Sequence, residues 1–513
     1  MLSLAFRNLW RNPKRSGITL AAIAVGVWAL VFVWAFIDGV NEQMIVNNIQ
    51  YLTGHLKVHR RGYHEDKALA LAMEAAMPGE LSTITEGLLV TPRVEGGALV
   101  SAAQHSATAM IFGVEPEQET RVTTLHRTLF EGRYLSGAPL ELVLGDNLAR
   151  ELAVGVGDSV DLVVQAADGS IGADRFRLVG LFDTGIDVLD ENLVILPLVS
   201  AQDLYSLWGR HTSWVLRVDN RQAVAAIDQR LQQHLGDGYE VYPWFRLLPS
   251  VVQAVAFHEA VAYIVLWVVF IVVAAGIANT LLMSVMERLR EIGVMRALGT
   301  QGSQVLTLVL WESLILACLG LVAGNIIGIG FTYYWSVQGM DLSAYSEAMP
   351  GLSGIVYPLL RLDHLLLTSA VVFLVCLLPA LPPAWRAARM DPVQAIRGIT
   401  PRARIAGRIE RWLVLPARWL WLQLAWRNLF RNPRRSALTG GATAFGMAAF
   451  IFLYALVDGF FEQMINNSTQ LLSSHIQLDF GLNYAHRNTV PACAGILAPI
   501  NFAKNLVLAH AHR

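Results

Sequence analysis

Charged residues are scarce in this sequence. Only 15% of its 513 residues are Asp, Glu, Lys or Arg, whereas 54% are hydrophobic, and the mean hydropathy is +0.45. Soluble globular proteins carry about 25% charged residues, so the composition argues against a purely soluble chain. Cysteine is scarce too. Cys318, Cys376 and Cys493 are too few to indicate a disulfide framework.

A nucleotide-binding loop is also missing. No Gly-x-x-x-x-Gly-Lys-Ser/Thr sequence, the loop that cradles phosphates in P-loop ATPases, occurs in the chain. No group of residues has the spacing of a metal site or of a nucleophile with its base. We interpret His55, His59 and His64 as parts of a strand and the loop after it. We therefore expect no catalytic residue, metal site or cofactor in this chain.

Long apolar runs dominate what is present. A helix needs about 20 consecutive apolar residues to cross the hydrocarbon layer of a bilayer. Five runs of this kind predict membrane spans over 17–40, 259–286, 301–336, 364–385 and 436–458. The first run is too long for a signal peptide and is followed by no small-residue cleavage site, so we interpret it as an uncleaved anchor.

Basic residues set the expected orientation. They cluster in 1–16, in 287–300 and across 386–435. By the positive-inside rule, these three segments are cytoplasmic and the N-terminus is inside. The segments left on the outside are the long stretch 41–258, the loop 337–363 and the tail 459–513. Residues 1–16 alternate apolar and basic side chains, which predicts a cytoplasmic helix that lies along the membrane surface.

The long outer segment, 41–258, has the pattern of a soluble domain. Short apolar or alternating runs predict strands over 140–144, 159–165, 175–181, 192–198 and 213–218. Helical patterns cover 146–152, 200–207 and 221–235. The segment exceeds 200 residues, so we expect an α+β domain that buries a core of its own.

An internal repeat links the two ends of the chain. Residues 4–16 recur without a gap as 424–436, and Asp38, Gly39 and His55 recur as Asp458, Gly459 and His475. This similarity indicates two tandem copies of one unit. It stops near Leu478, so we expect 459–513 to be a truncated second repeat, cut short or frameshifted.

The segment 287–300 connects the second and third spans. Met286, Leu289, Ile292 and Met295 recur at helical spacing, which predicts a short amphipathic helix. One interpretation is an ordinary basic turn between two membrane helices. The other is a helix that docks into a groove of a partner protein.

Family resemblance favours the second interpretation. Residues 286–300, MERLREIGVMRALGT, resemble the coupling segment of FtsX/MacB-type ABC transporter permeases. Residues 386–397, RAARMDPVQAIR, resemble the closing motif of their four-span unit. The resemblance implies that an ABC ATPase dimer, which holds ATP and magnesium, presses on this segment. The residues expected to couple to it are Glu287, Arg288, Arg290, Glu291, Met295 and Arg296.

The same resemblance extends to the third span and to the outer domain. Gly320, Gly324 and Gly328 lie four residues apart, a spacing that lets helices approach closely. Glu312 could mark an ion path, but similar permeases carry a glutamate there, so we expect a structural acid near the membrane edge. The outer domain resembles the MacB-like periplasmic core domain through 145–150, 156–158, 176–183 and 194–202.

The resemblance therefore implies an α-helical membrane protein of five spans with one large extracytoplasmic α+β domain, in the bacterial inner membrane. It implies a permease of the lipoprotein-releasing LolC/LolE branch, suggested by residues 54–58, GHLKV. The expected partners are the ATPase, a second permease copy, a periplasmic carrier or lipoprotein, and membrane lipids, with no nucleic acid. Two alternatives stay open, a mechanical regulator of a periplasmic cell-wall hydrolase and an ion-driven transporter; few intramembrane charges support the latter.

Overall fold

The computed structural model describes residues 2–11, 13–74, 88–343, 354–389, 393 and 433–475. The chain divides into two compact units, Met1–Leu453 and Tyr454–Arg513. Helix α19, Pro433–His475, crosses the boundary, and its end is all that the structure describes of the second unit. The helix begins at the proline that corresponds to Pro13 in the repeat and ends at the histidine that corresponds to His55.

Five helical segments of the described chain are long and apolar enough to cross a membrane. They are Ser16–Thr53, Pro249–Glu287, Gly302–Gln338, Leu362–Ala388 and Gly440–Gly459. The five spans predicted from the sequence are therefore confirmed, and the chain is a multi-pass membrane protein.

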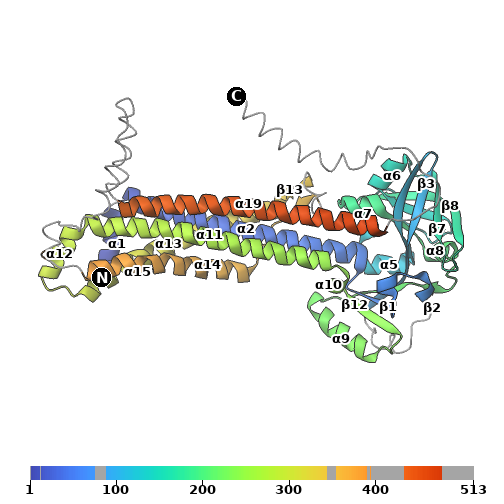
Figure 1. Cartoon of the computed structure of the whole chain (residues 1–513), viewed down its shortest axis with the longest axis horizontal. Coiled ribbons are helices and arrows are strands. Elements are labelled where there is room, and N and C mark those ends of the chain that lie inside the picture. Colours follow the sequence, from blue (N-terminus) through green and yellow to red (C-terminus); the bar gives the residue numbers. More distant parts are fainter. Residues whose placement is uncertain are drawn as a thin grey trace, which may run out of the picture. The chain divides into compact units, whose positions relative to one another are not determined.

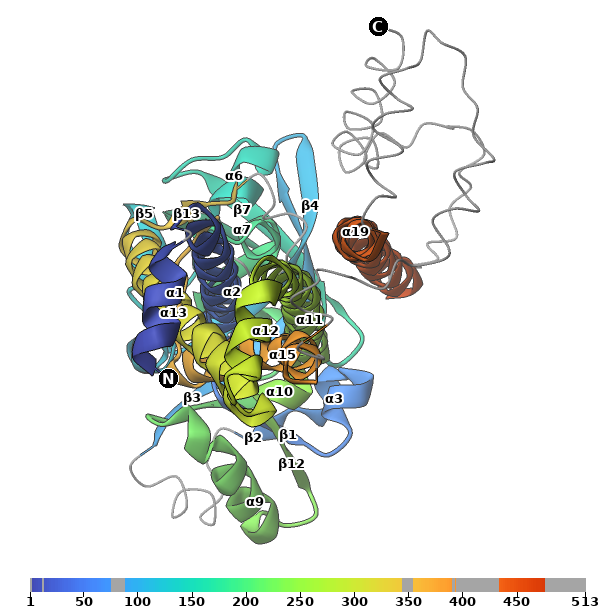
Figure 2. The same ribbon diagram turned by 90° about the vertical axis from the view of Figure 1, so that its left-hand side faces the viewer.

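Four of these segments form a bundle in the first unit (Figures 1 and 2). Helix α2, Pro13–Asn48, packs against α11, Pro249–Glu287, and against α13, Gly302–Gln338. It also packs against α14, Leu362–Leu377. Apolar side chains from all four helices fill the space between them, among them Ile23, Val27, Val31, Leu266, Ile277, Leu316 and Val372. The short helix α1, Leu2–Arg11, lies against α13.

Two spans differ from the sequence prediction. Helix α2 has 36 residues and is therefore about 54 Å long, well beyond the roughly 30 Å hydrocarbon core. It ends in a π-helical turn, η1, Ile49–Thr53. The fourth span is broken by the 3-10 turn η6, Leu378–Ala380, before α15, Leu381–Ala388. Prolines at 379, 382 and 383 explain the break, because proline lacks the N–H that a helix interior needs.

The domain between α2 and α11 is α+β, as predicted. Its strands are β1 Leu56–Arg60, β2 Met73–Glu74, β3 Leu89–Ala102, β4 His105–Val114, β5 Leu129–Gly132, β6 Glu141–Gly145, β7 Ser159–Gln165, β8 Ile171–Phe182, β9 Leu193–Pro197, β10 Arg210–His211, β11 Ser213–Arg217 and β12 Tyr239–Pro243. Its helices and 3-10 turns are α3 Tyr63–Asp66, η2 Leu69–Leu71, α5 Pro116–Val122, η3 Leu125–Thr128, α6 Asp146–Leu152, α7 Asp187–Asn192, α8 Leu198–Leu204, η4 Arg221–Ala223, α9 Val224–His234 and α10 Trp244–Leu247.

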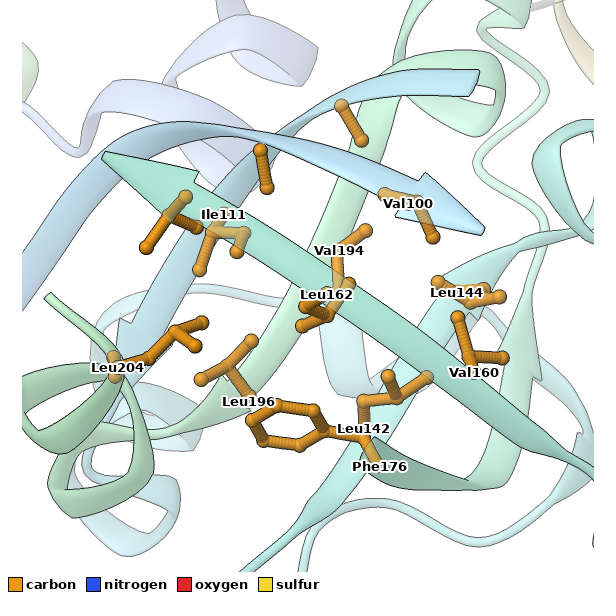
Figure 3. Close-up of a cluster of buried hydrophobic side chains, with 14 of the residues drawn as sticks. Val100, Ile111, Leu142, Leu144, Val160, Leu162, Phe176, Val194, Leu196 and Leu204 are labelled. Carbon is orange, nitrogen blue, oxygen red and sulfur yellow. The ribbon is translucent and has the colours of Figure 1, made fainter. Parts of the chain in front are cut away.

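Ten of these strands form one sheet, in the order β12-β1-β11-β3-β4-β9-β6-β8-β5 with β7 paired to both β3 and β8. These pairings close β3, β4, β9, β6, β8 and β7 into a ring, which leaves those strands without free edges. Figure 3 shows the apolar cluster of this region. It contains Val100, Ile111, Leu142, Leu144, Val160, Leu162, Phe176, Val194, Leu196 and Leu204.

The sequence prediction missed the hairpin of β3 and β4. Strand β3 contains Pro92 and two glycines, which are poor strand formers. It also carries Arg93 and Glu95, charges that do not fit the pattern of a buried strand. The structure satisfies these charges within the domain, a compensation that local sequence does not reveal.

The loop between α13 and α14 forms a small ladder of β13, Met340–Asp341, and β14, Ile355–Val356. Most of the predicted closing motif 386–397, the first part of the second repeat and the tail 476–513 lie outside the described residues.

Candidate functional site

The segment that joins α11 to α13 contains a separate short helix. Helix α11 ends at Glu287, Arg288 leaves the helical conformation (φ −97°, ψ 16°), and α12 covers Leu289–Ala297. Gly299 has φ +98°, a conformation that glycine adopts without steric cost. A capping box between Gln301 and Gln304 then starts α13. The predicted amphipathic helix is present, but it is shorter than the predicted segment.

One face of α12 packs on the bundle. Ile292, 6% exposed, and Met295 contact an apolar cluster from α13 and α15, which contains Val305, Val309, Ala384 and Ala387. The Arg296 guanidinium donates a hydrogen bond to the carbonyl of Ala388, at the C-terminus of α15. The negative end of the α15 dipole also stabilises a cation at that position. Helix α12 is therefore attached to α13, its neighbour in the chain, and to α15, which lies far from it in the sequence.

A buried ion pair fixes the break between α11 and α12. Nη1 of Arg288 lies 2.8 Å from Oε1 of Glu312 on α13, and both side chains are largely buried. A charge in a low-dielectric site needs a partner, and each of these groups provides one for the other. Glu312 therefore has a partner from the link between α11 and α12. The spacing of residues in the sequence does not predict this pair.

The opposite face of α12 is exposed. Arg290, Glu291 and Val294 lie on it, Glu287 ends α11 just before the break, and Leu298 follows α12. All five residues are exposed, and we call them the exposed α12 face. Leu298, 83% exposed, adds a second exposed apolar side chain to Val294, which is 48% exposed. Arg11 of α1 lies 2.6 Å from Oε1 of Glu291, so this face continues onto α1.

The six residues predicted to couple to an ATPase therefore divide into two sets. Glu287, Arg290 and Glu291 belong to the exposed α12 face, whereas Arg288, Met295 and Arg296 point into the protein. The sequence pattern also placed Met286 with the apolar stripe. The structure corrects this, because Met286 belongs to α11 and is 42% exposed. The break at Arg288 changes the direction in which the side chains before it point.

The three glycines of α13 lie against α2. A Cβ atom at Gly320 would come within 2.5 Å of Cγ2 of Ile23, and one at Gly324 within 2.6 Å of Cβ of Val27. At Gly328 the distance to Cβ of Val31 is 3.1 Å. The contact residues on α2 also recur at intervals of four, so the two helices meet along one continuous line. Close approach of this kind requires the absence of a side chain on one helix.

Polar side chains fix α2 at the other end of the bundle. His364 of α14 lies 2.6 Å from Oδ2 of Asp38, and His258 of α11 is hydrogen-bonded to Oδ1 of Asn41 at 2.8 Å. Sequence analysis missed both contacts. One sequence signal could have pointed to the contact of Asp38 with His364. Asp38 recurs as Asp458, which marks Asp38 as part of the repeated unit.

The described residues contain no group of three or more His, Cys, Asp or Glu side chains placed to hold a metal ion. His55 precedes β1, His59 lies in β1 and His64 in α3. His59 is buried, and its Nδ1 lies 3.1 Å from the carbonyl oxygen of Thr212. Burial lowers the pKa of His59 to about 4, so the ring is neutral at ordinary pH.

Comparison with protein families assigns both parts of the chain. The family described as MacB-like periplasmic core domain matches residues 16–234, and the family described as FtsX-like permease C-terminal matches residues 263–392. The first match covers most of α2 and the α+β domain as far as α9, and the second runs from within α11 through α15.

Curated relatives agree with these matches. The lipoprotein-releasing system transmembrane protein LolC of Xylella fastidiosa is 26% identical over 409 residues, which cover 75% of this chain and 95% of that protein. LolE of Haemophilus influenzae is 26% identical, over 60% of this chain and 76% of its own length. The macrolide export ATP-binding/permease protein MacB of Hyphomonas neptunium is 25% identical, over 77% of this chain and 60% of its own length. The solved periplasmic region of MacB from Actinobacillus actinomycetemcomitans is 14% identical, with a TM-score of 0.28, over 41% of this chain and 97% of that structure.

Proposed function

Because the chain belongs to the FtsX/MacB-type ABC transporter permeases, we propose that it couples ATP hydrolysis by a separate subunit to movement of its α+β domain. The movement would serve lipoprotein release or a related export process. Support for this role comes from α11, whose 39 residues run without interruption from the domain to Arg288 and α12. A push on α12 reaches the domain through one stiff helix.

The proposed orientation places α12 in the cytoplasm and the α+β domain in the periplasm. Basic residues lie at the α12 end of the bundle on three separate elements: Arg7 and Arg11 on α1, Arg290 and Arg296 on α12, and Arg386 on α15. Short segments rich in Lys and Arg stay on the cytoplasmic side of a membrane. This orientation places the N-terminus on the cytoplasmic side of a bacterial inner membrane.

The exposed α12 face is the observation that carries the proposal. It presents both signs of charge beside Val294 and Leu298, a mixture that suits a protein groove with a polar rim. Its opposite face is attached to α13 and α15 through Ile292 and Arg296. A partner that moves α12 therefore moves α11, to which α12 is joined in the chain, together with α13 and α15.

The proposed partner is an ABC ATPase dimer, which would bind ATP and magnesium. This chain has no P-loop sequence of its own. A second permease copy would complete the membrane part, as either a homodimer or a heterodimer. In the periplasm, the proposed partner is a carrier protein or a lipoprotein. Membrane lipids surround the spans.

The relatives named for lipoprotein release, LolC and LolE, favour export of that cargo. A mechanical regulator of a periplasmic cell-wall hydrolase is the second candidate, because the linkage from α12 to the domain serves either role. Deletion of the gene separates the two. Mislocalised envelope lipoproteins indicate release, whereas a septation defect with normal lipoprotein sorting indicates regulation.

Affinity purification of the tagged chain in mild detergent, followed by mass spectrometry, tests the proposed coupling. We expect an ABC ATPase to co-purify with the wild type and to be lost from the Glu287→Ala/Arg290→Ala variant. The matched control is Arg361→Ala/Asp363→Ala, an exposed ion pair at the start of α14, at the domain end of the bundle. Recovery of no ATPase with the wild type, or equal recovery with Glu287→Ala/Arg290→Ala, would contradict the proposal.

A further inference from the structure

A buried group of charges lies where α2 meets the α+β domain. Lys57 of β1, Arg93 and Glu95 of β3, and Glu119 of α5 form it, and we call these four residues the junction cluster. The two cations and two anions balance in charge. Nζ of Lys57 lies 2.6 Å from Oε1 of Glu95, and Nη2 of Arg93 lies 2.5 Å from Oε1 of Glu119.

Arg93 connects this cluster to the end of the membrane helix. Its side chain is 0% exposed, and its Nη1 donates a hydrogen bond of 2.6 Å to the carbonyl of Leu52, in the π turn that ends α2. The guanidinium also lies over the ring of Phe112, 4.4 Å from the centroid. One planar group therefore holds the helix end, strand β4 and α5 at the same time. A lysine would have to reach both acceptors from one nitrogen, without the fixed fork through which two guanidinium nitrogens bind Leu52 and Glu119 separately.

The covalent connection at this point is by itself bendable. A π turn replaces the regular helix over Ile49–Thr53, and Gly54 follows with φ +62°. The last carbonyls of a helix have no partner within the helix, so they are open to an outside donor. Arg93 is the donor to one of them. The hydrogen bond spans the hinge and fixes the direction in which the domain leaves α2.

The electrostatic balance of the cluster keeps Arg93 in place. Burial alone would raise the pKa of Glu95, but Lys57 and Arg93 beside it hold that pKa at about 2. The carboxylate therefore stays ionised at any ordinary pH. The hydroxyl of Thr123 donates a further hydrogen bond to Oε1 of Glu119, 2.9 Å away.

Strand β3 leads away from the junction. Arg93 lies near its start, and nine residues of extended chain, roughly 30 Å, separate Arg93 from Ala102 at the turn into β4. Along that length β3 pairs with β4 residue by residue, from Arg93 opposite Val114 to Ala102 opposite His105. Figure 1 shows this long hairpin at the domain end of the molecule. Strand β3 also pairs with β11 at Arg93 and with β7 at residues 99–101, so a rotation at Arg93 moves the hairpin turn together with the ring of strands that contains it.

We propose that Arg93 is the positioning residue that transmits movement of α2 into the β3–β4 hairpin, through its simultaneous bonds to Leu52 and Glu119. This inference rests on the proposed function, because it requires α2 to move when the ATPase acts. Other contacts also join α2 to the domain: Tyr51 and Leu52 pack against the apolar cluster around Phe112, Glu42 pairs with Arg221, and Gln50 is hydrogen-bonded to Thr124. None of these three is a buried charge contact, because the pair of Glu42 and Arg221 is partly exposed and weakened by solvent and the others involve neutral groups.

Distance measurements between spin labels test the inference in the full chain with its ATPase in nanodiscs. The background carries alanine at positions 318, 376 and 493 in place of the native cysteines. One label pair, at Tyr333 and Val46, reports movement of α2 relative to α13. A second pair, at Tyr333 and Gln104, reports movement of the hairpin turn. In the wild type, we expect ATP to shift both distance distributions.

In Arg93→Met/Glu119→Gln, which removes both charges, the first pair should still shift and the second should not. The control Asp161→Asn/Arg175→Met, which removes an exposed ion pair between β7 and β8, should behave as the wild type. A full shift of the second pair in Arg93→Met/Glu119→Gln would overturn the inference. If the first pair does not shift even in the wild type, the proposed function fails, and there is no movement for Arg93 to transmit.

A second variant covers the case in which Arg93→Met/Glu119→Gln does not fold. Arg93→Lys keeps the charge but loses the forked geometry that binds Leu52 and Glu119 through two separate nitrogens. We expect it to reduce the shift of the second pair by at least half, with the first pair unchanged. A shift equal to that of the wild type would overturn the inference.

Discussion

The guanidinium of Arg288 lies 2.8 Å from the carboxylate of Glu312, at the point where α11 gives way to α12. The pair connects the link between two helices to a third helix, α13, close to the membrane edge. An acidic residue within a membrane span often marks an ion path. Here the acid has a cation of the same chain beside it, which favours a structural role for Glu312.

Removal of one partner of this pair should be costly. Arg288→Met leaves the Glu312 carboxylate buried without its cation, and we expect a loss of about 3 kcal/mol in the free energy of unfolding. The double variant Arg288→Met/Glu312→Leu should recover most of that loss, because no unpaired charge remains. Thermal unfolding in detergent, followed by tryptophan fluorescence, measures the difference. Equal stability of wild type and Arg288→Met would show that the pair does not form.

The glycine line on α13 predicts a steep dependence on side-chain size. A Cβ at Gly324 would lie 2.6 Å from Cβ of Val27 and 2.8 Å from the carbonyl oxygen of Ala24. Gly324→Ala should therefore separate α13 from α2 and destabilise the protein by about 1–3 kcal/mol. Gly330→Ala is the matched control, because a Cβ there has nothing within 4 Å. The prediction fails if both substitutions have the same effect on thermal stability.

A buried carboxyl in the α+β domain predicts a dependence of stability on pH. Burial raises the pKa of Asp190 to about 7, against the hydrogen bonds donated by the amide and hydroxyl of Thr184. The ordinary pKa in the unfolded chain is 3.8, so the folded state keeps the proton over a wider range. The stabilisation from this site is complete below about pH 3.8 and is lost as the pH rises through about 7.

Asp190→Asn should therefore raise the unfolding temperature strongly at pH 8 and by less at pH 5, where only part of the stabilisation has been lost. The exposed Asp174→Asn, on β8 of the same domain, serves as the control and should leave the unfolding temperature unchanged at both values. A lower unfolding temperature for Asp190→Asn at pH 8 would contradict this account of the site.

The contact of Asp38 with His364 predicts energetic coupling between α2 and α14. A double-mutant cycle of Asp38→Asn and His364→Gln should give an interaction of at least about 1 kcal/mol, since both side chains are largely buried. The exposed pair of Arg361 and Asp363, only a few residues away, should give less than about 0.5 kcal/mol in the same cycle. Coupling of equal size in the two cycles would mean that burial does not strengthen the contact.

The spans could be predicted because the bilayer imposes a length and an apolar composition that a single sequence shows directly. Strands such as β7 and β11 were found for a similar reason, since their apolar runs lie between clear turn signals. The junction cluster could not be predicted in this way. Arg93 and Glu95 lie in β3, whereas their partners Leu52, Lys57 and Glu119 come from other elements, and only the tertiary fold brings them together.

The candidate site shows the same limit. The motif 286–300 predicted a helix and a set of coupling residues, but not which of them face outward. That division follows from the break at Arg288 and from the contacts of Ile292 and Arg296 with α13 and α15. These contacts join segments far apart in the sequence, so helical periodicity alone does not determine them.

Cross-linking from the exposed α12 face tests the central claim most directly. A photoreactive amino acid is placed at Arg290 or Val294 in the tagged full chain, cells are irradiated, and the adducts are identified by mass spectrometry. The control position is Tyr333, an exposed residue near the other end of α13. We predict adducts with an ABC ATPase from Arg290 and Val294 and none from Tyr333. Absence of an ATPase adduct at both α12 positions, or equal yield at Tyr333, would contradict the account.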